Sequence, residues 1–181
     1  MEDKINTIPT PVEQPAAIFD FTGTHVTARL DRDAIKASGL KVALYLDDAR
    51  TPTQVLPGYM PWIVVRNFRE FASFIMLNGI PDFISFDHDL HPEHYAPMQY
   101  WNGDYEYWAA NQKFKHETGL DCVKWLILWC ENHPELKIEN TSIHSFNKVR
   151  GHLMRTNING YKQHRGWEPN CYEGTHPFKE N

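Results

Sequence analysis

Short apolar runs alternate with segments of helical spacing along most of this chain. Four runs have the length and composition of buried parallel strands: residues 41–47, 62–67, 82–87 and 140–145. Three segments repeat their apolar residues at helical intervals: 68–79, 118–134 and 147–158. Residues 32–40 are expected to form one helical turn that ends at Gly39. The alternation predicts an α/β domain, a doubly wound, mostly parallel sheet with helices on both faces.

The remaining segments lie before, within and after this domain. Residues 1–40 contain several prolines and a candidate hairpin at 18–30, so we expect an N-terminal arm and β extension that pack on the core. The domain itself is assigned to residues 41–160, with a polar and aromatic insertion at 90–116 that forms either a packed aromatic cluster or a nucleobase-stacking lid. Residues 161–181 have no clear period and are predicted to be a C-terminal tail, without a convincing fifth strand.

Composition and charge narrow the class of protein. A chain of 181 residues with 41% hydrophobic residues is long enough for one domain with its own core. The net charge of −5 and the lack of a long basic run argue against tight binding to duplex DNA. The sequence shows neither a membrane-spanning run nor a signal-peptide pattern. Cys122 and Cys130 lie in a helical apolar pattern, which favours buried reduced thiols and a cytoplasmic location.

Acidic residues stand at the ends of two predicted strands. Asp47 and Asp48 end the first, and Asp87 and Asp89 follow the third on either side of His88. Ligands of open α/β sheets bind outside the carboxyl ends of the strands, and clustered carboxylates repel unless a cation compensates them. The four acids therefore predict a site for Mg²⁺ or Mn²⁺, which prefer oxygen ligands. For Asp47 and Asp48 alone, loop carboxylates that cap backbone amides are an equally good interpretation.

Two histidines and a serine accompany these acids. His88 titrates near neutral pH and is interpreted either as a general acid or base or as a residue that orients a neighbouring acid. His144 and Ser145 end the fourth strand, where they can donate to a leaving group and to a phosphoryl oxygen. Asn147 adds an amide to the site or caps the next helix.

A zinc site is an alternative for part of this region. His91 and His94 continue a spacing of three residues from His88. Pro92 disfavours the regular helix that would bring the three side chains to one face.

Basic residues and a helix start supply candidate contacts for a phosphate. Arg50 follows the acidic pair and Arg66 ends the second strand, so both are assigned to phosphate binding, with surface ion pairs as the alternative. Thr118 and Gly119 open a helix whose free amides can bind an anion or can simply be capped.

These motifs resemble those of a known family. The strings LYLDDAR (44–50), SFDHDL (85–90), TGLDC (118–122) and IHSFN (143–147), with the spacing of Trp62 and Arg66, are similar to the cyclic-phosphate-processing receiver-like domains. That family is an enzymatic offshoot of the receiver domains of two-component signalling. The resemblance covers about residues 41–158 and implies a receiver-like (flavodoxin-like) fold.

The resemblance also implies roles. Asp47 and Asp48 match the receiver acids that hold a divalent cation, and Asp87 matches the phosphoacceptor position. His88 and His144 are additions that imply proton transfer to or from a cyclic phosphate, in a nucleotide or at an RNA end, in a setting such as phage defence, counter-defence or RNA repair. A receiver carries a lysine after its fifth strand, and the lack of a match here argues against a phosphorelay switch.

We therefore predict a phosphoric ester hydrolase that acts on a cyclic phosphate with the help of a metal ion. The catalytic residues are expected to be Asp87, His88, His144 and Ser145. Substrate binding is assigned to Arg50, Arg66, Thr118, Gly119 and Asn147. The alternative is a non-catalytic receiver-like module that binds or sequesters a nucleotide signal or a protein partner.

Overall fold

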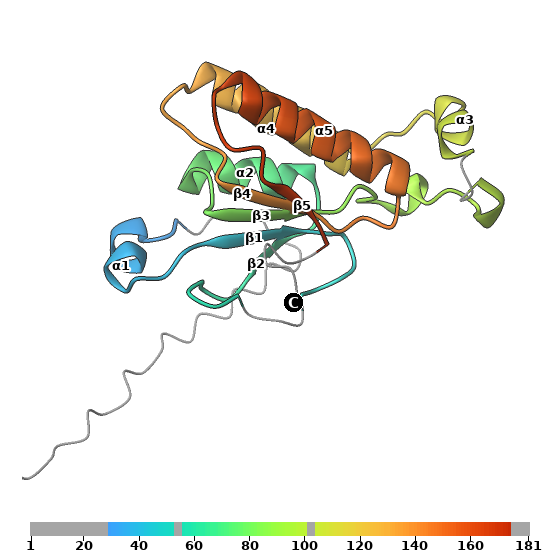
Figure 1. Ribbon diagram of the computed structural model, residues 1–181. Coiled ribbons are helices and arrows are strands. Elements are labelled where there is room, and N and C mark those ends of the chain that lie inside the picture. Colours follow the sequence, from blue (N-terminus) through green and yellow to red (C-terminus); the bar gives the residue numbers. More distant parts are fainter. Residues whose placement is uncertain (1–28, 53–55, 101–103, 175–181) are drawn as a thin grey trace, which may run out of the picture.

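A five-stranded sheet forms the centre of the computed structural model, which describes residues 29–52, 56–100 and 104–174 (Figure 1). The strands are β1 (Ala43–Leu46), β2 (Ile63–Val65), β3 (Phe83–Phe86), β4 (Asn140–Ile143) and β5 (Cys171–Glu173). They lie in the order β2-β1-β3-β4-β5, and each neighbouring pair is parallel. The predicted parallel α/β sheet is confirmed.

The helices agree with the predicted periodicity in four of five cases. They are α1 (Arg32–Ala37), α2 (Phe68–Asn78), α3 (Tyr105–Ala110), α4 (Gly119–Asn132) and α5 (Lys148–His164). Gly79 ends α2 with a φ of 74°, a conformation that favours glycine. The helix α5 continues to His164, beyond the predicted end at 158, and α3 was not predicted because six residues in an aromatic segment show no helical spacing. Two 3₁₀ turns, Pro92–His94 and Met98–Tyr100, lie in the same insertion.

The three long helices α2, α4 and α5 cover the same face of the sheet (Figure 1). The connections β2–α2–β3, β3–α4–β4 and β4–α5–β5 all advance in one direction across the sheet. Because such crossovers are right-handed, their helices must lie on one side. Alternate strand residues such as Leu44 and Phe86 pack there against Phe71, Leu126 and Ile158.

A loop packs on the other face of the sheet. The order of elements along the chain predicted helices on both faces. The connection from β1 to β2 runs in the opposite direction, so it passes on the opposite side of the sheet. Its residues Leu56, Tyr59 and Trp62 pack on Ala43 and Phe83. The predicted hairpin at 18–30 falls almost wholly outside the described residues.

The strand β5 corrects the sequence analysis, which found no fifth strand and a tail from residue 161. It pairs in parallel with β4 at the edge of the sheet and is three residues long, with only Cys171 buried. A strand of this kind has no apolar run by which to be recognised. The amide of Cys171 donates to Asn159 Oδ1 on α5 (3.0 Å), which fixes the strand against that helix.

A buried lysine ties α5 to the connections that precede β4 and β5. Lys162 is fully buried, and its ammonium donates to the carbonyl of Glu139 (2.5 Å) and to the side chain of Asn170. Burial lowers the pKa of Lys162 to about 8. The side-chain Nδ2 of Asn170 donates in turn to Asn140 Oδ1 at the start of β4 (3.0 Å).

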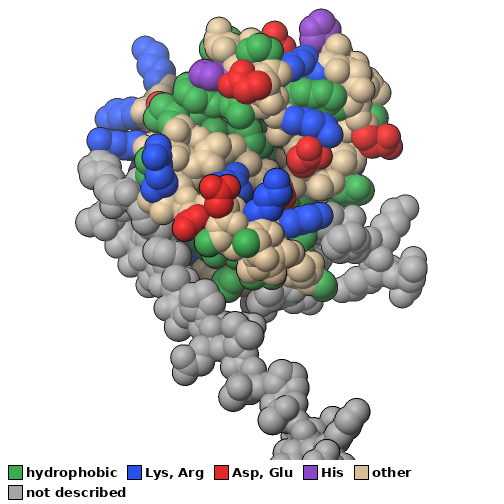
Figure 2. All heavy atoms as spheres, turned by 90° about the vertical axis from the view of Figure 1, so that its left-hand side faces the viewer, with side chains coloured by type: hydrophobic (Ala, Val, Ile, Leu, Met, Phe, Trp, Pro, Cys, Tyr) green, Lys and Arg blue, Asp and Glu red, His purple; other side chains and the backbone are tan. Residues whose placement is uncertain are grey.

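The surface and the cysteines agree with a globular domain. Within the described part of the chain, no helix has the length and apolar character to span a membrane. Figure 2 shows one face of the molecule, on which basic and acidic side chains are interspersed. Cys122 and Cys130 are buried free thiols, as predicted, and so is Cys171.

The buried lysine predicts a rise in stability with pH. Between pH 8 and about 10.4 the unfolded chain holds the Lys162 proton more tightly than the folded chain, so the free energy of unfolding should rise with pH, by up to roughly 3 kcal/mol. Urea denaturation from pH 7.5 to 10.5 measures this rise. Lys162→Met should remove it, whereas Lys124→Met, at an exposed position of α4, should retain it. An equal rise in both variants would contradict the assignment.

Candidate active site

The ends of three neighbouring strands meet at the point where the strand order reverses. The chain goes from β1 outward to β2 and then returns past β1 to β3, so the reversal lies between β1 and β3. Leu46, Phe86 and Ile143 are partners in register across β1, β3 and β4. The residues that follow them, Asp47, Asp87 and His144, therefore stand level with one another at the carboxyl edge of the sheet.

The carboxylate of Asp47 is fully buried and accepts four hydrogen bonds. Its Oδ1 accepts from the amides of Ala49 (2.9 Å) and Arg50 (2.5 Å). Its Oδ2 accepts from Arg50 Nε (2.6 Å) and His144 Nε2 (3.2 Å). Burial raises the pKa of Asp47, but the hydrogen bonds from His144 and from the two amides outweigh it, and the pKa lies well below its usual value. Asp47 is therefore a permanent anion in this fold.

Arg50 joins the first strand end to the third. Its Nη2 lies 2.9 Å from Asp87 Oδ2, while its Nε contacts Asp47, and its guanidinium lies over the ring of Phe146 at 4.8 Å. Burial raises the pKa of Asp87; Arg50 counteracts this, the charge of Asp47 adds to it, and the net shift is upward. Ser145 donates a further hydrogen bond to Asp87. One cation thus serves two carboxylates.

His144 is held from both ring nitrogens. Its Nε2 contacts Asp47, and its Nδ1 lies 2.7 Å from Ser85 Oγ, which is 2.8 Å from Ser142 Oγ. Because Asp47 is an anion and only accepts, Nε2 carries the hydrogen of that bond. A neutral ring then accepts from Ser85 at Nδ1. The site thus continues into the sheet as a chain of hydrogen bonds.

Sequence reasoning missed the residues that hold this imidazole in place. Tyr45 stacks on the His144 ring with centroids 4.3 Å apart, and Trp62 packs edge-on against Tyr45 at 5.6 Å. Ser85 lies on the same face of the sheet. The sequence did contain a sign of these contacts. Tyr45 and Ser85 each carry a hydroxyl in an otherwise apolar strand, on the face opposite to that of their neighbours in the chain.

Three of the four predicted metal ligands come together. Asp47, Asp48 and Asp87 each offer an oxygen, and these oxygens lie within 4.8 Å of one another. Asp48 is the most accessible of the three, and its two oxygens accept from the hydroxyl of Tyr95 at 2.9 Å each. A set of three carboxylate oxygens, one of them on a partly exposed residue, fits Mg²⁺ or Mn²⁺. Asp89 does not join this group.

Asp89 and His88 form a second polar group beside the first. His88 is buried, with Nε2 3.3 Å from the hydroxyl of Tyr105, and burial together with the charge of Arg150 lowers its pKa to about 3. Burial and the charges of Asp87 and Asp48 raise the pKa of Asp89 to about 7, while Asn147 donates to it. The acid, and not the histidine, is therefore the group of this pair that titrates near neutral pH.

The other predicted contact residues support the site from within the protein. Arg66 donates through Nη1 to the carbonyls of Asp47 (2.9 Å) and Arg50 (2.6 Å), which fixes the loop between them. Thr118 caps α4 through a capping box, and Asn147 caps α5 through its Oδ1. Contacts of these residues with a substrate stay a prediction.

Gly119 allows α4 to approach the end of β3. A Cβ at this position would lie 1.8 Å from the carbonyl oxygen of Asp87 and 2.8 Å from its carbon. The amide of Gly119 donates to the carbonyl of His88 (2.8 Å). The backbone that carries both Asp87 and His88 is thus positioned by the first residue of α4.

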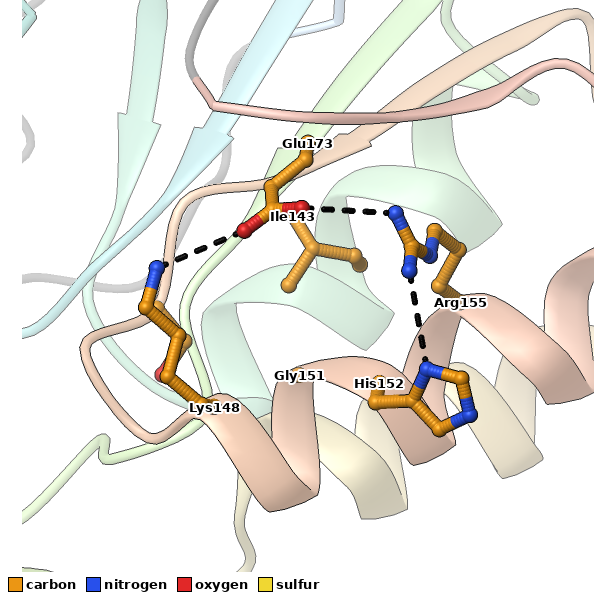
Figure 3. Close-up of a pocket in the computed structure, with 7 residues that line it drawn as sticks. Ile143, Lys148, Gly151, His152, Arg155 and Glu173 are labelled. Atoms are coloured by element: carbon orange, nitrogen blue, oxygen red, sulfur yellow. Dashed lines mark hydrogen bonds and ion pairs between the residues drawn. The ribbon is translucent and has the colours of Figure 1, made fainter.

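A small hollow of about 50 Å³ lies next to Ser145, between α5 and β5 (Figure 3). Glu173 lies between two cations there, 3.3 Å from Lys148 and 3.5 Å from Arg155. Arg155 also contacts His152 (3.5 Å). Basic groups therefore line the space on the α5 side of the strand ends.

The sheet order and the acids at its reversal point define a receiver-like α/β protein. A family model described as the cyclic-phosphate processing receiver domain matches residues 42–160, about two thirds of the chain. The protein belongs to this family, and the resemblance noted in its motifs is confirmed. No curated protein and no solved structure matches the chain.

The close approach at Gly119 predicts that a single methyl group disturbs the site. Gly119→Ala should lower the free energy of unfolding by roughly 1–3 kcal/mol, because helix and strand end must separate. Gly160→Ala is a matched control in α5 with nothing within 4 Å of the new Cβ, and it should stabilise by about 0.5–1 kcal/mol. Denaturant titration compares the two; equal effects would contradict the proposed constraint.

The Arg50 bridge predicts a dependence of stability on this one cation. Arg50→Gln leaves the buried Asp47 without its charged partner and should cost about 1–3 kcal/mol, less than a fully buried pair because Arg50 is partly exposed. Arg155→Gln, whose side chain is equally exposed and also pairs with a carboxylate, should change stability by less than about 0.5 kcal/mol. Urea denaturation at pH 7 in the presence of EDTA measures both. Similar losses in the two variants would contradict a special role for Arg50.

Proposed function

We propose that this protein is a metal-assisted phosphoesterase that opens a cyclic phosphate in a nucleotide or at an RNA end. The observation that carries the proposal is the group of three carboxylates at the ends of β1 and β3, in contact with a guanidinium and an imidazole. The family description, which names cyclic-phosphate processing, supports the same substrate class.

Asp47, Asp48 and Asp87 would hold the divalent cation. Bound there, a cation of this kind polarises a phosphoryl oxygen and lowers the pKa of a water molecule. Their oxygens fit such an ion in number, type and mutual distance.

Arg50 or His144 would then change its partner. Both side chains donate to Asp47 Oδ2, and together they fill its two lone pairs. An ion on Oδ2 would take one of these lone pairs, so Arg50 Nε or His144 Nε2 would be released to donate to the phosphate. The fork of an arginine suits two phosphate oxygens, and Ser145 adds a hydroxyl.

His144 would exchange a proton with the attacking water, and Asp89 would exchange one with the leaving oxygen. The Asp89 carboxyl is partly buried, and burial raises its pKa, which would let it give a proton to the leaving oxygen and take one back. We assign this step to Asp89 in place of His88, because His88 is neutral, buried and directed to Tyr105. The His88 Nε2 atom lies 3.8 Å from Asp89 Oδ1, beyond hydrogen-bond distance, so the role of orienting this acid stays a prediction for His88.

A binding module without turnover is the second candidate function. The observation that favours it is that Arg50 and His144 already have partners within the protein. A site of this kind is stable at rest and needs no chemical step. It would bind a nucleotide through the same donors.

The two functions predict different products. Purified protein with Mg²⁺ or Mn²⁺ is incubated with cyclic mono-, di- and trinucleotides and with RNA that ends in a 2′,3′-cyclic phosphate. We expect a linear phosphate product, and a loss of roughly 10²–10⁴-fold in rate for His144→Gln and Asp89→Asn, the range for proton-transfer residues. His164→Gln, at the end of α5, should retain full activity.

Recovery of intact nucleotide from a tight complex, with no product at any metal concentration, would contradict catalysis and favour the binding module. Product formed equally by the wild type and by Asp87→Asn would contradict the assigned site. Chromatography with mass detection separates these outcomes.

A further inference from the structure

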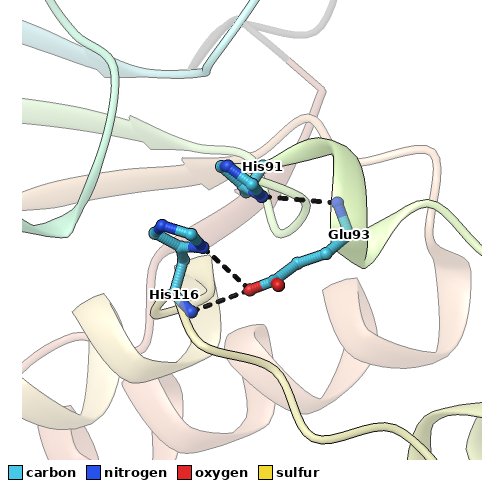
Figure 4. A group of neighbouring side chains, drawn as sticks. All are labelled: His91, Glu93 and His116. Carbon is cyan, nitrogen blue, oxygen red and sulfur yellow. Dashed lines mark hydrogen bonds and ion pairs between the residues drawn. The ribbon is translucent and has the colours of Figure 1, made fainter.

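Two histidines and a glutamate gather at the neck of the 90–116 insertion, where its first and last residues lie side by side, and they form a group separate from the three carboxylates (Figure 4). His91 begins the insertion and His116 ends it, yet their rings stack with centroids 3.8 Å apart and planes at 20°. Glu93 lies beside both in the 3₁₀ turn Pro92–His94. Each of the three residues offers one ligand atom within 4.8 Å of the others.

The Glu93 carboxylate already spans the neck. Its Oε1 accepts from the amides of Lys115 (2.8 Å) and His116 (2.7 Å) and from His116 Nδ1 (3.0 Å). On the other side, His91 Nδ1 accepts from the amide of Glu93 in a long bond of 3.4 Å. The side chains are thus held together by contacts within the protein.

A buried histidine keeps the two sides of the neck in place. His94 is fully buried; its Nδ1 accepts from the amide of Leu90 (3.1 Å) and its Nε2 donates to the carbonyl of His116 (3.1 Å). Both nitrogens of His94 are therefore used, and His88 faces Tyr105. Among the described residues, the zinc trio considered from the sequence spacing is not formed, and Glu93 and His116 replace two of its members.

We propose that His91, Glu93 and His116 bind a transition-metal ion of the Zn²⁺ type, which closes the neck of the insertion. Two imidazole nitrogens and one carboxylate oxygen are a donor set that zinc accepts, with water in the remaining position. The nearby carboxylate site has only oxygen donors, which suit Mg²⁺ instead. The two sites should therefore select different metals.

The ion would act on the active site through one side chain. An ion bound by residues 91, 93 and 116 would join the two ends of the 91–116 segment. Joining the ends of a loop reduces the number of conformations that the loop can adopt. Tyr95 lies directly after the turn that carries Glu93, and its hydroxyl donates to Asp48. A zinc ion at the neck would thus hold Tyr95 against the carboxylate site.

Metal binding can be measured without any assay of activity. The full chain is titrated with Co²⁺ in the presence of excess Mg²⁺, and the visible absorption of Co²⁺ reports nitrogen ligands; Zn²⁺ is then added as a competitor. We expect one Co²⁺ per chain, displaced by one Zn²⁺. His116→Ala and His91→Ala should each weaken binding at least tenfold, and the exposed His164→Ala should leave it unchanged.

Two further variants keep the result interpretable. Glu93→Gln preserves the shape of the neck and removes the charge, so it should weaken binding while circular dichroism shows a folded chain. Asp48→Asn should leave binding intact. Binding lost in Asp48→Asn and kept in His116→Ala would place the ion on the carboxylates and overturn the proposal, as would equal affinity in all variants.

Discussion

The buried anion of Asp47 is the constraint on which the site depends. A carboxylate without contact to water costs several kcal/mol unless donors replace its hydration, and here four donors do so. Two of these donors are backbone amides of the loop after β1, so the loop must turn back on itself. The other two, Arg50 and His144, come from that loop and from the end of β4. The need to satisfy one charge thus brings separate parts of the chain to the same point.

The helices and strands that were predicted from the sequence are those with a clear apolar pattern in their own residues. Strand ends at Asp47 and Asp87 were recognisable because apolar runs stop there, and the helices because their apolar spacing continues for three or four turns. The strand β5 gave no such signal: its position depends on Lys162 and Asn159, which hold it from α5. Contacts that join distant segments cannot be read from a local pattern, and this is why the edge of the sheet was missed.

The candidate active site can likewise be divided into features that the sequence predicts and features that depend on the folded structure. The meeting of Asp47, Asp87 and His144 follows from parallel register, which requires only that their strands be neighbours. The pKa values of His88 and Asp89, which follow β3, cannot be deduced from the strand register. Histidine usually titrates near neutral pH and aspartate does not, yet burial reverses the two at His88 and Asp89. Depth in the fold, and not residue type, decides which of them can exchange a proton.

The charge balance shows why a small cation and a phosphate would belong together here. Ionised together, the three carboxylates would carry three negative charges, of which Arg50 compensates one. A phosphate that approached this group alone would meet net repulsion. The two charges left over equal those of one divalent cation, so the group would be neutral with both Arg50 and the ion in place. The phosphate would no longer meet net repulsion, and the guanidinium of Arg50, at the edge of this group, would pair with its oxygens as well as with the carboxylates.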